Sequence, residues 1–186
     1  MWRIESENGW CIVAANWLPD EYVASIYHID FERLWAKGYR AVITDLDNTL
    51  TKWDSPDCPE KLVAFLASMR NRGFQLCVLS NNTQRRVDDF VRPLGITAIG
   101  KAGKPRKDGF RKALFSLKAD AAKTIMLGDQ VFTDIVGGNR AGLYTVLVRP
   151  IDPVENKGTR FLRHIERVLL RKMQVATTEY FRYDKK

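Results

Sequence analysis

The sequence has few cysteines and few histidines, and both shortages exclude particular kinds of chemistry. Its three cysteines, Cys11, Cys58 and Cys77, form no CxxC pair. This odd, scattered set argues against a disulfide framework and against a zinc site, and it fits a reducing compartment. The two histidines, His28 and His164, lie far from the polar motifs described below. We therefore expect neither disulfide bonds nor histidine-based catalysis.

The sequence also lacks a long apolar run. The longest candidate, residues 10–18, contains Asn16 and is shorter than the ~20 residues that a membrane span needs. Glu5 and Glu7 precede it where a signal peptide would carry basic residues. A P-loop is missing too, because residues 100–104 (GKAGK) lack the GxxxxGK[ST] spacing and precede a proline. We expect a cytoplasmic protein that is not a P-loop kinase or GTPase.

Acidic residues are fewer than basic ones, and the difference is unevenly distributed. The 186 residues include 30 Lys and Arg against 22 Asp and Glu, a net charge of +8. Residues 1–44 carry −2, residues 45–150 carry +6 and residues 151–186 carry +4. Such an excess favours an anionic partner, which could be nucleic acid, a phosphorylated substrate or a membrane surface.

Apolar runs and helical patterns alternate along the middle of the chain. Strands are predicted at residues 39–46, 75–80, 96–100, 124–127 and 144–148, with helices at 59–71, 83–91, 107–117 and 131–140. This alternation predicts an α/β fold, a three-layer, doubly wound, Rossmann-like parallel sheet spanning residues 39–150. We expect residues 1–38 to form a helical, aromatic-rich extension packed on or beside the core. Residues 151–186 are expected to form a basic amphipathic helix and tail.

Polar residues follow most of the predicted strands, at the edge of a parallel sheet where ligands bind. They are Asp45, Asp47, Ser80, Asn81, Lys104, Asp129 and Asp134. Clustered carboxylates repel each other unless a cation lies among them, and an all-oxygen set suits Mg²⁺. An aspartate beside Mg²⁺ can attack phosphorus, and a second carboxylate two residues later can act as acid and base. The pattern therefore points to phosphoryl transfer.

The same residues resemble the four motifs of the haloacid-dehalogenase-like (HAD) phosphohydrolase superfamily. Residues 45–49 (DLDNT) resemble the DxDxT motif, Ser80 and Lys104 resemble the second and third motifs, and residues 128–134 (GDQVFTD) resemble the fourth. Lys101 competes with Lys104, which fits the AxKP pattern better.

The resemblance implies a role for each motif residue. Asp45 would be the nucleophile and a Mg²⁺ ligand, and Asp47 the general acid and base with its carbonyl on the metal. Asp129 would be a metal ligand, and Asp134 either a ligand or the partner of one. The substrate phosphate would be held by Ser80, Asn81 and Lys104.

Motif spacing and the upstream sequence narrow the resemblance. Only 35 residues separate Asp45 from Ser80, and 24 separate Ser80 from Lys104. These intervals leave no room for a cap domain, as in the uncapped members (subfamily III). Residues 19–30 resemble the YqeG-type branch, which is related to phosphatidylglycerophosphate phosphatases. This resemblance implies hydrolysis of phosphatidylglycerophosphate to phosphatidylglycerol.

Three segments are compatible with a peripheral position at the inner membrane surface. They are a basic amphipathic pattern at residues 159–173, a basic cluster at 101–112, and an N-terminus in which all five tryptophans precede residue 54. Each segment could instead pack on the core or face solvent.

Two other functions remain open. One is a soluble phosphatase for a sugar phosphate, nucleotide or phosphoprotein. The other is a non-enzymatic RNA- or ribosome-binding module, although the aromatic residues are not interleaved with the basic cluster.

Overall fold

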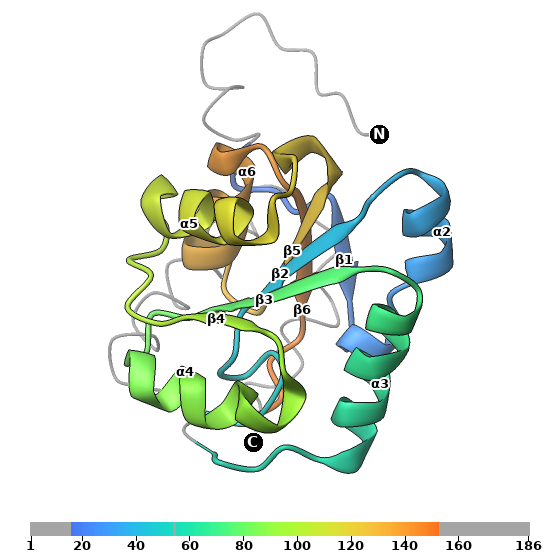
Figure 1. The fold of residues 1–186 in the computed structure, drawn as a ribbon. Coiled ribbons are helices and arrows are strands. Elements are labelled where there is room, and N and C mark those ends of the chain that lie inside the picture. Colours follow the sequence, from blue (N-terminus) through green and yellow to red (C-terminus); the bar gives the residue numbers. More distant parts are fainter. Residues whose placement is uncertain (1–15, 54, 153–186) are drawn as a thin grey trace, which may run out of the picture.

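The computed structural model describes residues 16–53 and 55–152, which form one parallel sheet covered by helices on both faces (Figure 1). The strands are β1 (Glu21–Val23), β2 (Ala41–Thr44), β3 (Gln75–Leu79), β4 (Thr97–Ile99), β5 (Thr124–Gly128) and β6 (Tyr144–Val148). Their order in the sheet is β1-β6-β5-β2-β3-β4, and every pair is parallel. Strand β2, which precedes Asp45, therefore lies between β5 and β3.

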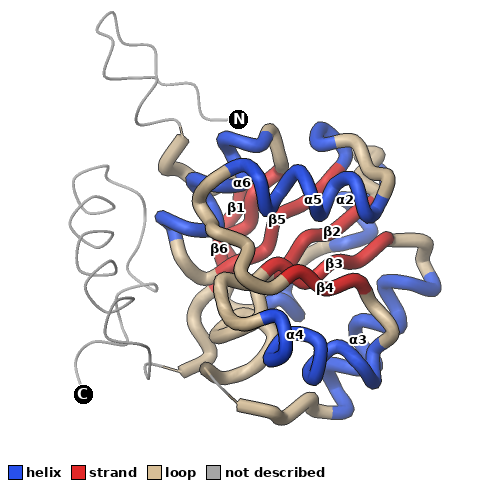
Figure 2. Tube along the Cα trace, turned by 60° about the vertical axis from the view of Figure 1, so that its left-hand side comes forward, coloured by secondary structure: helices blue, strands red, loops and turns tan. Residues whose placement is uncertain are grey.

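Helices cover both faces of the sheet. Figure 2 shows α5 and α6 on one face and α3 and α4 on the other. The α-helices are α2 (Phe31–Ala36), α3 (Glu60–Asn71), α4 (Gln84–Val91), α5 (Lys107–Leu117) and α6 (Val136–Ala141). Short helical turns lie at η1 (Ile26–His28), η2 (Arg92–Leu94), η3 (Ala121–Lys123) and η4 (Val131–Ile135).

Alternate residues of each central strand pack against opposite helical layers, as a period of two requires. In β3, Leu76 and Val78 join the core formed with α2, α3 and α4, whereas Cys77 and Leu79 join the core formed with α5. Both faces of the sheet are therefore buried, which explains the unbroken apolar run of this strand.

The nine predicted elements between residues 39 and 148 are confirmed, and the α/β fold with them. Helix α5 and strand β6 have the predicted bounds. The predicted helix at 131–140 differs in its first turn, which is a π-helical turn (η4) before α6. This wider turn carries Asp134.

The N-terminal segment contains a strand that we did not predict. Strand β1 pairs with β6 at the edge of the sheet, and Asp20 Oδ2 accepts a hydrogen bond from the Thr145 N–H at 2.8 Å. The tryptophans of this part differ in environment. Trp35 packs edge-on against Phe74, and Trp17 packs beside Phe132, whereas Trp53 is exposed.

Other predictions concern residues that the structure does not describe. The amphipathic pattern at 159–173 and the first two tryptophans lie outside the described residues, and the division of the chain at residues 38 and 150 stays a prediction. Within the described parts, no helix is both long and apolar enough to cross a membrane. The sequence predicts no cap domain in the two intervals between the motifs. The described part of the first interval, residues 46–53 and 55–79, contains α3 and β3 joined by loops. The second, residues 81–103, contains α4, η2 and β4 joined by loops.

Candidate active site

Three buried carboxylates meet at the carboxyl edge of the sheet. Asp45 follows β2, Asp129 follows β5, and Asp134 comes from the turn η4. One carboxylate oxygen from each lies within 4.8 Å of the others. The main chain extends the sheet to this point, since the Asp45 N–H donates to the Leu127 carbonyl at 2.8 Å. Neighbouring strands thus bring together residues that are 84 positions apart in the sequence.

A buried lysine joins two of these carboxylates. The Lys104 ammonium donates to Asp45 Oδ1 at 2.6 Å and to Asp134 Oδ1 at 2.7 Å. Its backbone is fixed by Asn81, whose amide oxygen accepts from the Lys104 N–H at 2.8 Å and whose amide nitrogen donates to the Lys104 carbonyl at 3.1 Å. Lys101 is exposed, so the geometry favours Lys104 of the two candidates.

Asp134 is positioned by the close approach of two backbone segments. Its Oδ2 accepts a hydrogen bond from the Gln130 N–H at 3.1 Å. A Cβ at residue 128 would lie only 2.3 Å from Asp134 Cβ and Cγ, so Gly128 is the residue that leaves room for this carboxylate. Each oxygen of Asp134 accepts one hydrogen bond and keeps a second lone pair, so this carboxylate holds Lys104 and still has the capacity to bind a metal ion.

The electrostatics of the cluster follow from its burial. Burial holds the pKa of Asp45 well above its usual value, and Asp134 and Asp129 raise it further, while Lys104 lowers it. Burial opposes the charge on Lys104, but Asp134 and Asp45 outweigh it and hold the pKa of the ammonium above its usual value. Three ionised carboxylates and one ammonium have a formal charge of −2. This charge and the oxygen donors fit a divalent cation.

Asp47 lies apart from the three-carboxylate cluster and turns toward α4. Its Oδ2 accepts from the Asn82 amide at 3.1 Å, and its Oδ1 accepts from Arg86 Nη2 at 3.3 Å. Arg86 also donates to the carbonyl of Ser55, in the loop that follows β2. Neither Asn82 nor Arg86 belongs to the set of site residues predicted from the motifs.

The other predicted phosphate ligands differ in their surroundings. Ser80 is buried directly after β3, and its hydroxyl oxygen accepts from the Asn82 N–H at 3.1 Å. The Asn81 side chain holds the Lys104 backbone, as described above, so its visible role is to position the lysine. Thr49, the last residue of the DxDxT motif, donates through its hydroxyl to Asp129 Oδ1 at 3.4 Å.

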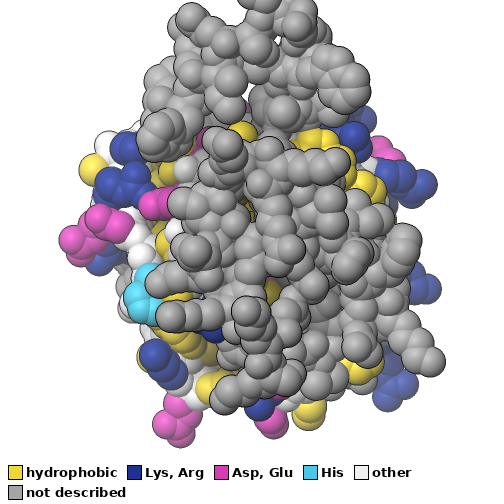
Figure 3. Space-filling view, turned by 180° about the vertical axis from the view of Figure 1, so that it is seen from behind, with side chains coloured by type: hydrophobic (Ala, Val, Ile, Leu, Met, Phe, Trp, Pro, Cys, Tyr) yellow, Lys and Arg dark blue, Asp and Glu magenta, His cyan; other side chains and the backbone are white. Residues whose placement is uncertain are grey.

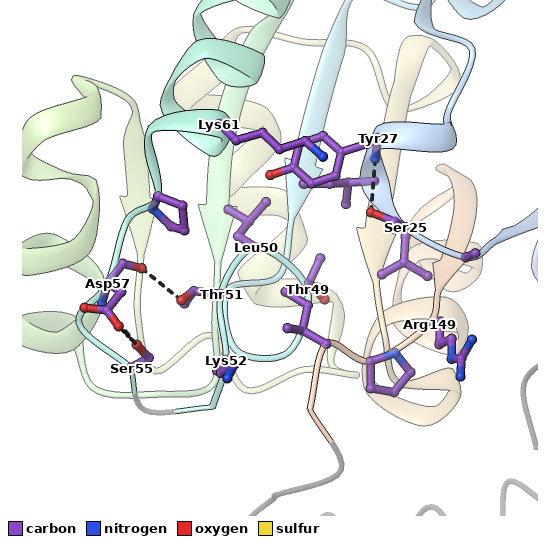
Figure 4. A pocket seen from close by; sticks show the side chains of 16 residues that line it. Ser25, Tyr27, Thr49, Leu50, Thr51, Lys52, Ser55, Asp57, Lys61 and Arg149 are labelled. Carbon is purple, nitrogen blue, oxygen red and sulfur yellow. Dashed lines mark hydrogen bonds between the residues drawn. The ribbon is translucent and has the colours of Figure 1, made fainter. Parts of the chain in front are cut away.

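A pocket of about 530 Å³ lies beside this site and shares Thr49 with it (Figure 4). Its lining comes from segments after β1, β2 and β6 and from the start of α3. Leu50 lies in its middle, and Lys61 extends along one margin over the ring of Tyr27, 4.2 Å from the ring centroid. The charged residues that line the pocket are three basic ones, Lys52, Lys61 and Arg149, and one acidic one, Asp57. The pocket therefore combines apolar walls with a basic margin.

A parallel α/β sheet with buried aspartates and a buried lysine at its carboxyl edge has the features expected of a protein that transfers phosphoryl groups. The family model that describes HAD-hydrolase-like proteins matches residues 101–150. The chain is 41% identical to the probable phosphatase YqeG of Bacillus subtilis over 153 residues, covering 82% of this chain and 89% of the relative. It therefore belongs to the HAD superfamily of phosphatases, in the family of YqeG.

More distant relatives agree with this assignment. Phosphatidylglycerophosphate phosphatase 1 of Arabidopsis thaliana is 30% identical over 165 residues, which are 83% of this chain but only 47% of the plant protein. The chain thus spans about half the length of that relative. The crystal structure of a HAD phosphatase from Thermococcus onnurineus matches with a TM-score of 0.52 at 12% identity, covering 70% of this chain and 97% of that chain. At this identity the structural match supports the fold alone.

Proposed function

We propose that the protein is a Mg²⁺-dependent phosphomonoester hydrolase that works through an aspartyl-phosphate on Asp45, and that it acts on phosphatidylglycerophosphate. The observation that carries the reaction is the buried pair of Asp45 and Lys104, 2.6 Å apart, at the carboxyl edge of the sheet. The ammonium orients the carboxylate and supplies positive charge where phosphoryl oxygens would develop negative charge.

In the first proposed step, a carboxylate oxygen of Asp45 attacks phosphorus while the bond from phosphorus to the leaving oxygen breaks. Asp47 gives its proton to that oxygen. In the second step, Asp47 takes a proton from water, and the water oxygen attacks phosphorus. The bond to Asp45 breaks, which regenerates the carboxylate and releases phosphate. Arg86 and Asn82 would hold Asp47 beside the leaving group, and Ser80 would donate to a phosphoryl oxygen.

The metal would be held by carboxylate oxygens of Asp45 and Asp129 and by the backbone carbonyl of Asp47. When bound, Mg²⁺ would neutralise charge on the phosphoryl group. Asp134 would fix Lys104 through Oδ1, and its carboxylate, which belongs to the same cluster, would be either a further metal ligand or the partner of one.

The proposed lipid substrate is supported by the named activity of the plant relative and by the adjacent pocket. Phosphatidylglycerophosphate carries a phosphodiester next to the terminal phosphate, and Lys52, Lys61 and Arg149 could balance that second charge. Because the enzyme would meet such a substrate at a membrane, we also propose a cytoplasmic protein that associates peripherally with the inner membrane surface.

The reaction is tested with Asp45→Asn. We expect this variant to release no phosphate while its circular dichroism shows that the protein stays folded. Near-normal turnover would remove Asp45 as nucleophile.

The substrate is tested separately, with Mg²⁺ present. Vesicles containing phosphatidylglycerophosphate should release phosphate faster than soluble sugar phosphates at equal concentration. The opposite ranking would replace the lipid with a soluble phosphate ester and leave the reaction class unchanged.

A further inference from the structure

Helix α5 exposes a large aromatic side chain on a basic surface. Phe115 is 86% exposed, the most exposed large hydrophobic residue of the described chain. An isolated exposed apolar residue is ordinary in itself. Phe115 differs because of the charges that surround it on the helix.

The helical period places Phe115 in the centre of the outer face of α5. The buried residues of the helix are Gly109, Phe110, Ala113 and Leu117, which face the sheet. With 100° between successive residues, Phe115 points almost directly away from that side. Figure 1 shows α5 on the outside of the sheet, next to α6.

Three basic residues lie near Phe115 in the sequence. Arg111 and Lys112 precede it by four and three residues, the spacings at which side chains on a helix become neighbours, and Lys118 ends the helix in a left-handed conformation three residues after Phe115. All three are exposed. The only acidic residue of α5 is Asp108, whose carboxylate lies 3.9 Å from Arg111 in a highly exposed pair. Figure 3 shows the reverse side of the molecule, where acidic and basic side chains are intermixed along the visible margin.

Exposed basic residues continue from α5 into the loop that carries Lys104. Lys101, Arg106 and Lys107 are exposed in the loop and first turn that follow β4, on either side of the buried Lys104. We define the α5 surface as Lys101, Arg106, Lys107, Arg111, Lys112, Phe115 and Lys118. The helix is about 16 Å long at 1.5 Å per residue, so this surface extends from the site lysine to Phe115.

We propose that the α5 surface docks the protein on an anionic lipid membrane, with Phe115 inserted among the headgroups. Between residues 101 and 118, six exposed cations outnumber the single carboxylate of Asp108, which complements a negatively charged lipid surface, and the aromatic ring of Phe115 adds apolar contact. A second copy of this chain would present the same positive charge, which disfavours self-association through this face. A lipid bound near Lys101 and Arg106 would lie next to the catalytic lysine.

The importance of this docking for catalysis rests on the proposed lipid substrate, but docking can be measured without any reaction. The full-length protein is sedimented with vesicles of phosphatidylcholine alone or with 30% phosphatidylglycerol. We expect stronger binding to the anionic vesicles, and weaker binding as salt increases. Phe115→Ser should weaken binding about tenfold, and Arg111→Gln and Lys112→Gln about fivefold each.

Two substitutions outside the α5 surface serve as matched controls. Val63→Ser removes an exposed apolar side chain from α3, and Arg85→Gln removes an exposed charge from α4. Both should bind vesicles as the wild type does. Phe115→Ser should also hydrolyse p-nitrophenyl phosphate at the wild-type rate, and Asp45→Asn should still bind vesicles. These two results separate a failure of docking from a failure of the proposed reaction.

Three outcomes would overturn the proposal. One is equal binding to neutral and anionic vesicles, or no binding to either. Another is unchanged binding by Phe115→Ser and Lys112→Gln, which would place any membrane contact elsewhere on the chain. The third is a wild-type dimer in vesicle-free solution that becomes a monomer in Phe115→Ser, which would make a second copy the partner of this face.

Discussion

Replacing Lys104 by methionine tests the electrostatic balance of the buried cluster. Methionine keeps most of the aliphatic volume but removes the ammonium that bonds Asp45 and Asp134. The two carboxylates would then face each other without a cation. Removing one partner of a buried ion pair costs about 3–5 kcal/mol. Since 1 kcal/mol corresponds to roughly 2–4 °C in a protein of this size, the melting temperature should fall by roughly 10 °C.

The assay is thermal and urea unfolding followed by circular dichroism, with a chelator present. Lys101→Met is the matched control, because Lys101 is exposed in the same loop and should change stability by less than about 0.5 kcal/mol. The double variant Lys104→Met with Asp134→Asn should regain about 1 kcal/mol or more, since it removes one uncompensated charge. Equal stability of Lys104→Met and Lys101→Met would refute the reasoning.

The pH dependence of the stability difference between Lys104→Met and the wild type is an independent test of the same reasoning. Burial raises the folded-state pKa of Asp45, so its contribution to stability is complete at low pH and is lost as the pH rises through that pKa. Lys104 opposes this rise in the wild type, and Lys104→Met does not. The stability difference between the two proteins should therefore shrink as the pH is lowered from 8 to 5. A difference that grew on acidification would contradict the assignment of the charges.

Three further predictions concern single residues. Arg86→Met should lower kcat/KM for alkyl phosphates more than for p-nitrophenyl phosphate. The reason is that only a poor leaving group needs the proton of a well-placed Asp47. Equal losses for the two substrates would mean that Arg86 supports the fold and does not position Asp47. Gly128→Ala should destabilise the protein by about 3 kcal/mol or more in urea unfolding, because the added Cβ would overlap Asp134. A loss of stability below about 1 kcal/mol would contradict the close approach of residue 128 to Asp134. The thiol of Cys77, whose pKa burial raises to about 12, should resist alkylation at pH 8 until the protein is unfolded, as peptide mapping would show.

Much of the candidate site could be predicted because local sequence and topology give the same answer. Asp45 and Asp129 each follow an apolar run, and parallel strands necessarily bring such ends to one edge. The lysine needed the structure, since Lys101 and Lys104 follow the same strand three residues apart. Their backbone path decides between them, and it turns one into the core and leaves the other in solvent.

Features that depend on contacts between distant segments could not be predicted from the sequence. Arg85 and Arg86 are adjacent in one helix, and only the rotation of α4 against the loop after β2 determines that Arg86 contacts Asp47. Strand β1 has three residues, and it is a strand because the edge of β6 pairs with it rather than because of its own pattern. The π-helical turn that carries Asp134 likewise depends on how the chain leaves β5.

The hydrophobic alternation of β2 is itself part of the site. Ala41 and Ile43 face the α5 layer, Val42 faces the α3 layer, and Asp45 continues the first of these rows. The central position of β2 places Asp45 between the ends of β3 and β5, and therefore between Ser80 and Asp129. A register shift of one residue would exchange the two faces and turn Asp45 away from Lys104. The apolar residues of β2 thus determine the direction of the nucleophile as well as the packing of the core.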